Sequence, residues 1–226
     1  MNRNGWIAFG ILVLVIAAIV AFFFLLPKGA APGPVATTTP ETGNLEGTSL
    51  YANGTYGFTM KYPGSAKESD TFSTSYILST QWRAEAPANS TGTPIVEIVG
   101  YHTQSDHSFP REFTAMVRVG VATSSAEVAS CTKVTPDTGE TALPDALING
   151  TTWKAFSFGD AATMHYVKGT SYRAVHDGKC FVMEKLATGS SYMDDPDSPD
   201  DVPQAALDKA YEDLSLIVES FAFTKL

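Results

Sequence analysis

Apolar and polar residues alternate in several short segments of the chain after residue 49. The clearest segment is 56–63, in which Tyr, Phe, Met and Tyr occupy one face of an extended chain and Gly, Thr and Lys the other. This period of two is typical of a strand with one buried face, and Pro63 ends it. Further strands are predicted at 76–82, 95–101, 115–121, 152–158 and 164–167.

Asp177-Gly178 separates two more strand-like runs, at 171–176 and 179–186. Asp-Gly favours a two-residue type I′ turn, so the pattern predicts a β-hairpin. The short loop fixes a register that pairs Val175 with Cys180, Ala174 with Phe181 and Tyr172 with Met183. The face that carries Tyr172, Ala174, Phe181 and Met183 is predicted to lie in the core.

Helical spacing of apolar residues marks the last part of the chain, after an acidic stretch, Asp201 and Pro203, which are typical of a helix start. A shorter helix is predicted at 124–130, with Ser124 or Ser125 as N-cap. Strands joined by hairpins, together with these helices, predict an α+β fold in which an antiparallel β-sheet is flanked by helices. The apolar stripe of the C-terminal helix, which should pack against the sheet, consists of Leu207, Ala210, Tyr211, Leu214, Ile217, Val218 and Phe221.

The N-terminal segment has a different pattern, because residues 7–26 are only Ile, Leu, Val, Phe, Ala and Gly. As a helix this run covers roughly 30 Å, which is the hydrocarbon thickness of a bilayer. The alternative is a cleaved signal peptide, whose apolar core is shorter and ends at a small-x-small site. The length favours a retained anchor. The predicted organisation is a short cytoplasmic tail (1–4), a transmembrane signal-anchor helix (5–27), a Pro/Thr/Gly-rich linker (28–48) and a globular domain (49–226).

Orientation depends on Arg3 and the terminal amine against Lys28, which places the N-terminus inside by the positive-inside rule. The chain is therefore predicted to be a single-pass membrane protein with an extracytoplasmic C-terminal domain. The formal net charge is −9, and no stretch concentrates Lys or Arg. This charge pattern argues against a nucleic acid partner.

Cys131 and Cys180 are the two cysteines of the chain, an even pair in a domain predicted to face an oxidising compartment. A disulfide between them would close a loop of about 50 residues and stabilise the fold by about 4 kcal/mol on the chain-entropy account. The alternative is a pair of buried free thiols.

Candidate metal ligands are few. His102, His107, His165 and His176 are scattered without the spacing of a zinc site, which favours surface or core histidines. An acidic loop could hold calcium through carboxylate oxygens, although two prolines break the EF-hand spacing. The alternative for this loop is a solvated segment before the helix; its aspartates are Asp194, Asp195, Asp197, Asp200 and Asp201. No other cofactor is predicted.

Other polar motifs have structural interpretations. Arg173 and Glu184 are diagonal neighbours in the predicted hairpin, which favours a cross-strand ion pair over a catalytic couple. The Asn-x-Thr sequences at Asn53, Asn89 and Asn149 match glycosylation sites, but Asn-Gly also marks turns. The sequence has no nucleophile elbow, Walker loop, dinucleotide fingerprint or zincin helix.

The two ends of the domain carry short motifs: Tyr51-Ala52-Asn53, Tyr56-Gly57-Phe58, Lys61-Tyr62-Pro63 and Ser220-Phe221-Ala222-Phe223. They resemble the opening and closing motifs of PsbP-like domains, the fold of the lumenal photosystem II extrinsic protein and of many bacterial envelope proteins. The middle, with Tyr172-Arg173, His176, Cys180 and Glu184, is similar to anchored bacterial proteins of that type. The resemblance implies an α/β/α-like sandwich and a binding or assembly role, and it implies no chemistry.

These observations favour a non-enzymatic envelope domain that binds a protein or small ligand. One alternative is an anchored hydrolase or metal-dependent enzyme whose site forms only in three dimensions. A deep pocket containing His165 or His176 beside a carboxylate would favour the enzyme. Another alternative is a structural subunit of an envelope complex, which a large exposed apolar patch would support.

Overall fold

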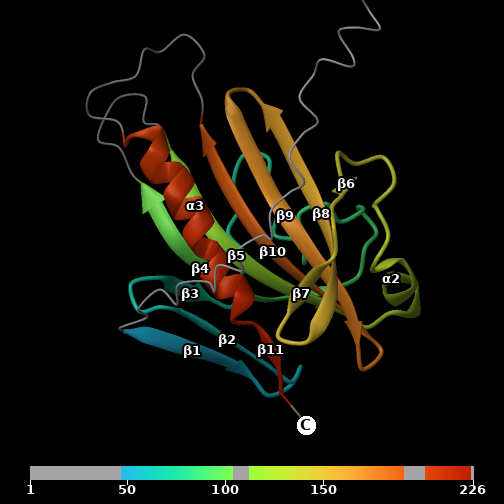
Figure 1. Cartoon of the computed structure of the whole chain (residues 1–226). Helices are drawn as coiled ribbons and strands as arrows, with labels where there is room; N and C mark the ends of the chain where they lie inside the picture. Colours follow the sequence, from blue (N-terminus) through green and yellow to red (C-terminus); the bar gives the residue numbers. More distant parts are fainter. Residues whose placement is uncertain (1–46, 104–111, 191–201, 225–226) are drawn as a thin grey trace, which may run out of the picture. The chain divides into compact units, whose positions relative to one another are not determined.

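The computed structural model describes residues 47–103, 112–190 and 202–224 (Figure 1). This part of the chain folds into strands and two helices, which confirms the predicted α+β class. The helices are α2 (Ser125–Ser130) and α3 (Gln204–Glu219). The strands are β1 (Thr48–Asn53), β2 (Phe58–Pro63), β3 (Lys67–Ser69), β4 (Thr93–Thr103), β5 (Phe113–Ala122), β6 (Thr141–Ala142), β7 (Ala146–Ile148), β8 (Thr151–Ala162), β9 (His165–His176), β10 (Lys179–Ser190) and β11 (Ala222–Phe223).

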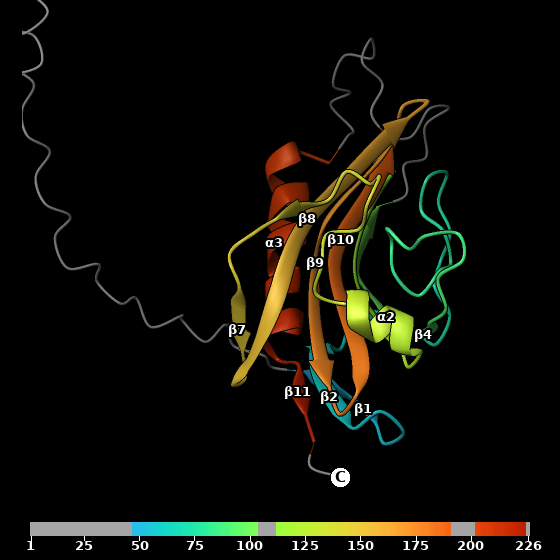
Figure 2. The ribbon, with the colours of Figure 1, turned by 90° about the vertical axis from the view of Figure 1, so that its right-hand side faces the viewer.

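Two antiparallel sheets make up the fold. The larger is an 8-stranded sheet in the order β3-β4-β5-β10-β9-β8-β6, with β7 paired to β8, and the smaller has the order β1-β2-β11. Helix α3 packs on one face of the large sheet, against β4, β5 and β10. Helix α2 and residues 70–92, which we call the cover loop, lie on the opposite face (Figure 2).

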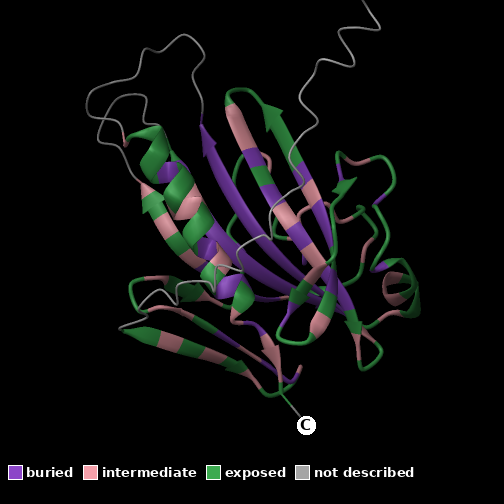
Figure 3. Ribbon diagram, in the orientation of Figure 1, coloured by how far each residue is buried: buried purple, intermediate pink, exposed green. Residues whose placement is uncertain are grey.

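The hairpin of β9 and β10 has the predicted register, including Val175 opposite Cys180 and Tyr172 opposite Met183. Asp177 and Gly178 have φ values of 47° and 70°, as a type I′ turn requires. The runs predicted at 164–167 and 171–176 belong to one strand, β9. Strand β10 lies at the centre of the large sheet and is buried along almost its whole length (Figure 3).

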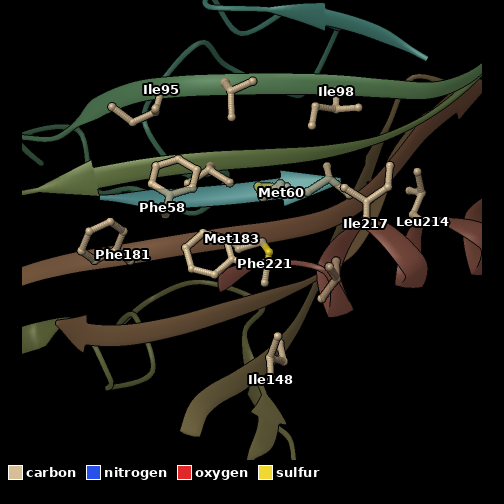
Figure 4. Close-up of a cluster of buried hydrophobic side chains, with 14 of the residues drawn as sticks. Phe58, Met60, Ile95, Ile98, Ile148, Phe181, Met183, Leu214, Ile217 and Phe221 are labelled. Atoms are coloured by element: carbon tan, nitrogen blue, oxygen red, sulfur yellow. The ribbon is translucent and has the colours of Figure 1, made fainter. Parts of the chain in front are cut away.

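The α3 face contains the main core. Leu207, Leu214, Ile217 and Val218 of α3 are buried, which confirms the predicted apolar stripe. These side chains pack against large apolar side chains from both sheets (Figure 4). The sheet residues include Phe58 and Met60 of β2, Ile95 and Ile98 of β4, and Phe181 and Met183 of β10.

Both helix starts follow their sequence signals. The Ser124 hydroxyl accepts a hydrogen bond from the Glu127 amide at the first turn of α2, which confirms the predicted cap. Helix α3 begins at Gln204, with Pro203 as the residue before it. Asp201, the other predicted start signal, lies outside the described residues.

The strand predicted at 76–82 is wrong, because these residues belong to the cover loop. Leu78 and Trp82 are buried, and their spacing produced the misleading alternation. The backbone of the cover loop forms hydrogen bonds with side chains of the sheet instead of pairing as a strand. Arg118 donates to the Ser79 carbonyl at 3.2 Å, and Glu184 accepts from the Ala84 amide at 3.0 Å.

The turn interpretation of Asn149 is confirmed. Asn149 and Gly150 have φ values of 45° and 81° and connect β7 to β8. The Asn149 side chain donates to the carbonyl oxygens of Glu219 and Phe221, both at 2.8 Å, and so caps the end of α3. This asparagine therefore ties the β7–β8 hairpin to the C-terminal helix.

The predicted anchor at 5–27 lies outside the described residues, as does almost all of the predicted linker. Within the described part, no helix combines the length and the apolar character needed to cross a membrane.

Candidate ligand pocket

Side chains on the sheet face opposite α3 form successive bands across the strands. The first band lies at the end of the sheet where the Asp177-Gly178 turn joins β9 to β10. It is apolar and contains Trp82 and the two cysteines. A band of buried charges follows, then a second apolar band of Leu78, Met116, Phe158, Val167 and Leu186. The last band is a polar pocket at the other end of the strands. Strand β5 shows this order directly, because Ala122, Arg118, Met116 and Thr114 succeed one another on this face.

The first band contains the predicted disulfide. Cys131 and Cys180 are bonded, which confirms the pairing expected from the sequence. Beside it, the Trp82 indole donates to the Ser90 hydroxyl at 2.7 Å, and that hydroxyl donates to Glu127 of α2 at 2.7 Å. A Cβ atom at Gly120 would overlap the Trp82 carbonyl, so glycine is needed for the cover loop to approach β5. These contacts fix one end of the loop.

Arg118 of β5 is the centre of the charged band. Its guanidinium donates to Glu97 of β4 at 2.8 Å and to the carbonyl oxygens of Ser73 and Ser79 in the cover loop. Glu97 in turn accepts from the Ser73 amide at 3.0 Å. Both charged side chains are 1 % exposed, so this ion pair is fully desolvated.

Arg173 does not pair with Glu184, so the predicted cross-strand ion pair is wrong. Its guanidinium forms a two-pronged contact with Glu140, which lies on the segment between α2 and β6. Glu184 instead accepts the Ala84 amide with both carboxylate oxygens at 3.0 Å. The sequence-based register was correct, but residues from outside the hairpin supplied closer partners for both charges.

Burial determines the electrostatics of this band. It raises the pKa of the Glu184 carboxyl, although the arginines nearby act in the opposite direction. It also lowers the pKa of the Arg83 and Arg118 guanidinium groups. The full band consists of Arg83, Glu97, Arg118, Glu140, Arg173 and Glu184. Positive and negative charges balance, and several of their partners are backbone groups of the cover loop, so the band holds that loop in place.

The pocket lies between the first part of the cover loop and the ends of β4, β5, β9 and β10. Its volume is about 410 Å³, within the range of roughly 300–1,000 Å³ that is typical of small-molecule sites. Its apolar members are Leu78, Val99 and Met116, which continue the second apolar band. Its other lining residues are Lys67, Ser73, Thr74, Ser75, Tyr76, His102, Glu112, Thr114, His165, Thr188 and Gly189.

Two imidazoles have defined partners in the pocket. His102 Nδ1 lies 2.7 Å from the Thr114 hydroxyl. The His165 ring stacks on the Tyr76 ring with centroids 5.0 Å apart, and the Tyr76 hydroxyl lies 3.2 Å from that of Thr163. The histidines and hydroxyls can donate or accept hydrogen bonds, so the pocket offers many polar partners to a ligand.

The turn between β8 and β9, next to the pocket, carries backbone strain. Thr163 and Met164, in the turn between β8 and β9, have φ values of 50° and 66°. Residues other than Gly, Asn and Asp rarely adopt such positive φ values. Met164 is 56 % exposed and Tyr76 is 63 % exposed, so two large apolar side chains face solvent at this end. Strained turns cluster at functional sites, which supports a role for this end of the sheet.

The structure brings together only part of the predicted site. His102 and His165 line one pocket, whereas His176 stacks on Phe223 near the other end of β9, with centroids 3.7 Å apart. His107 and the five aspartates of the proposed calcium loop lie outside the described residues, so calcium binding stays a prediction. Across the ranges that the structure describes, no group of three or more His, Cys, Asp or Glu side chains is arranged to hold a metal ion.

Sequence reasoning missed the pocket and most of the charged band. One signal was available, because residues 70–92 are too long for an ordinary strand connection and contain the hydroxyl run Ser73-Thr74-Ser75. Loops of this length in compact domains are usually binding loops or disordered segments.

Comparison with known proteins gives no assignment: no protein-family model matches the chain, and no curated protein matches its sequence.

Proposed function

We propose that this chain is a membrane-anchored, extracytoplasmic binding domain of PsbP-like type. Its ligand would occupy the pocket between the cover loop and the sheet. The pocket is the observation that carries this proposal, because it joins a ligand-sized volume to convergent polar groups and an exposed aromatic ring. The apolar N-terminal run would hold the domain at the outer face of the membrane.

Contacts between the two ends of the globular domain support the PsbP-like assignment. The Ser220 hydroxyl accepts from the Lys61 amide at 2.8 Å, and the Phe58 and Phe221 rings stack with centroids 5.0 Å apart. Strand β11 also pairs with β2. The short motifs that carry the resemblance therefore form one unit, as expected of motifs that specify a fold. The placement of α3 on one face of the large sheet, and of the short helix α2 beside the cover loop on the other, supports the α/β/α sandwich that the resemblance implies.

A blocking variant tests the proposed pocket. Thr114 is half-buried on the pocket floor, so Thr114→Trp would fill the space. Thr152→Trp is the matched control, because Thr152 is exposed on β8 at the opposite end of the sheet. The full chain, in a detergent without sugar headgroups, would be screened by thermal melting against neutral sugars, inorganic anions, amino acids and nucleotides.

At least one compound is expected to raise the Tm of the wild type and of T152W but not of T114W. A ligand at about 100 times its Kd stabilises the folded state by roughly 2.7 kcal/mol, which a melt detects readily. Equal shifts in T114W and the wild type would mean that ligands bind elsewhere, and the proposal would then be abandoned.

A second candidate function is an enzyme that uses the same pocket. His165 and the carboxylate of Glu112 both line it, and imidazoles are the commonest general acids and bases. A ligand found in the screen would be recovered after incubation and analysed by mass spectrometry. A chemical change that depends on His165 would favour the enzyme, and unchanged ligand would favour the binding domain.

A further inference from the structure

We infer that the pocket binds a neutral carbohydrate, with one sugar ring stacked on Tyr76. This inference rests on the proposed binding function and names the chemical class of its ligand. Three properties of the lining carry it: its charge, its hydrogen-bonding groups and its aromatic rim.

The charge of the lining favours a neutral ligand. Of the described residues that line the pocket, only Lys67 and Glu112 carry a formal charge when the imidazoles are neutral, and these two charges cancel. The buried arginines of the neighbouring band are occupied by Glu97, Glu140 and loop carbonyls. A site for a phosphate or carboxylate would require unneutralised donors, and Glu112 would repel such a ligand.

The polar groups of the lining suit a polyol. Thr74, Ser75 and Thr188 contribute hydroxyls that can donate or accept, as sugar hydroxyls do. The Ser73 hydroxyl donates to Glu97 at 2.5 Å, which leaves its oxygen free to accept from a ligand. Lys67 only donates and the Glu112 carboxylate only accepts, so the wall offers both kinds of partner to successive hydroxyl groups.

Tyr76 provides a stacking surface at the rim. One face of its ring rests on His165, and the residue is 63 % exposed, so the opposite face is open to solvent. The electron-rich face of an aromatic ring attracts the weakly positive C–H groups of a sugar ring. The neighbouring apolar floor of Leu78, Val99 and Met116 can pack against the less polar face of the same saccharide.

Saturation-transfer NMR on the full chain, in lipid nanodiscs, would test this inference. The neutral probes are cellotriose, maltotriose and triacetylchitotriose, and the anionic probes are inorganic phosphate, followed by ³¹P line broadening, and citrate. Tyr76→Ala removes the stacking surface, whereas Tyr76→Phe keeps the ring and removes only the hydroxyl. Leu147→Ala, at an exposed position outside the pocket lining, is the control for loss of an exposed apolar side chain.

The expected result is transfer from the protein to at least one trisaccharide, with an affinity that Y76A lowers about tenfold and that Y76F and L147A leave nearly unchanged. Binding that Y76A does not weaken would overturn the inference, because the sugar would then lie elsewhere.

Phosphate or citrate binding without saccharide binding, blocked by T114W, would overturn the carbohydrate assignment and leave the proposed binding function intact. If no probe binds here while the broader melting screen finds a T114W-sensitive ligand, the carbohydrate assignment alone fails. If that screen also finds no such ligand, the proposed function fails as well.

Discussion

The two faces of the large sheet are stabilised in different ways. On the α3 face, apolar side chains from β2, β4, β10 and α3 form one continuous cluster. On the opposite face, apolar bands alternate with buried charges and end in a polar pocket. A regular helix satisfies its own backbone, so it can be covered by apolar packing alone, whereas an irregular loop cannot.

The charged band follows from that requirement. The cover loop has few backbone partners of its own, and its buried carbonyl and amide groups would be costly without hydrogen bonds. Arg118, Glu97 and Glu184 supply those bonds from the sheet. Buried charge therefore lies on the face of the sheet that an irregular loop, together with the short helix α2, covers.

The largest expected effect is the loss of Arg118. Arg118→Met leaves Glu97 buried without its partner and removes the donors to Ser73 and Ser79, so the free energy of unfolding should fall by about 3–5 kcal/mol. Chemical denaturation of the full chain in nonionic detergent measures this loss. The double variant R118M/E97Q, which also removes the unpaired carboxylate, should be more stable than R118M. A loss below about 1 kcal/mol, the value of an exposed pair, would contradict a buried role.

Leu214→Ala tests the opposite face. Leu214 is buried in the core under α3, and such truncations cost about 2–5 kcal/mol through lost burial and the cavity left behind. Leu216→Ala on the same helix is the control, because Leu216 is 40 % exposed and should change the free energy of unfolding much less. The same denaturation measurement serves both variants. Equal losses would mean that α3 is not seated on the sheet as described.

The raised pKa of Glu184 predicts a pH dependence of stability. Folded Glu184 keeps its proton to a higher pH than the unfolded chain does, so its contribution to stability is full below the ordinary pKa of about 4.5. That contribution is lost as the pH rises through the raised pKa of the folded state, because the charged form is the one that burial disfavours. Unfolding free energies measured at increasing pH, starting below this ordinary pKa, should show this decline in the wild type.

Glu184→Gln should flatten that decline, because the amide keeps an acceptor for Ala84 but does not titrate. Burial also raises the pKa of Glu85, so a smaller decline of the same sign should remain. Glu219→Gln, at an exposed position on α3, is the control and should preserve the wild-type curve. An unchanged pH profile in E184Q would remove Glu184 from this explanation.

The smallest expected effect concerns the strained turn between β8 and β9. Met164→Gly relieves a positive φ that costs an L-residue roughly 1–2 kcal/mol, so the net gain in unfolding free energy should be about 1 kcal/mol. Ala161→Gly, in the adjacent part of β8, should instead destabilise, because it only adds freedom to the unfolded chain. A destabilised M164G would show that this turn carries no strain.

Sequence patterns predicted the α3 face better than the loop face. The helical stripe, the alternation in β2 and the Asp177-Gly178 hairpin follow from local periodicity and turn chemistry, and the structure has them. The contact between Arg173 and Glu140, and the pocket of His102 and His165, depend on residues far apart in the chain. Local sequence patterns do not specify such long-range pairings, so the site could not be predicted from the sequence.

The disulfide also changes what a break in the chain would do. Cys131 and Cys180 enclose β6, β7, β8 and β9, with a sequence separation of 49. A single cut at exposed Leu143 or Leu147 would leave two polypeptides joined by the disulfide, and the ladder between β5 and β10 would also hold them together. On a denaturing gel without reductant, the cut protein would run as one band. With reductant, it would separate into two fragments. Where a protease makes such a cut, the domain would therefore persist as a two-chain protein.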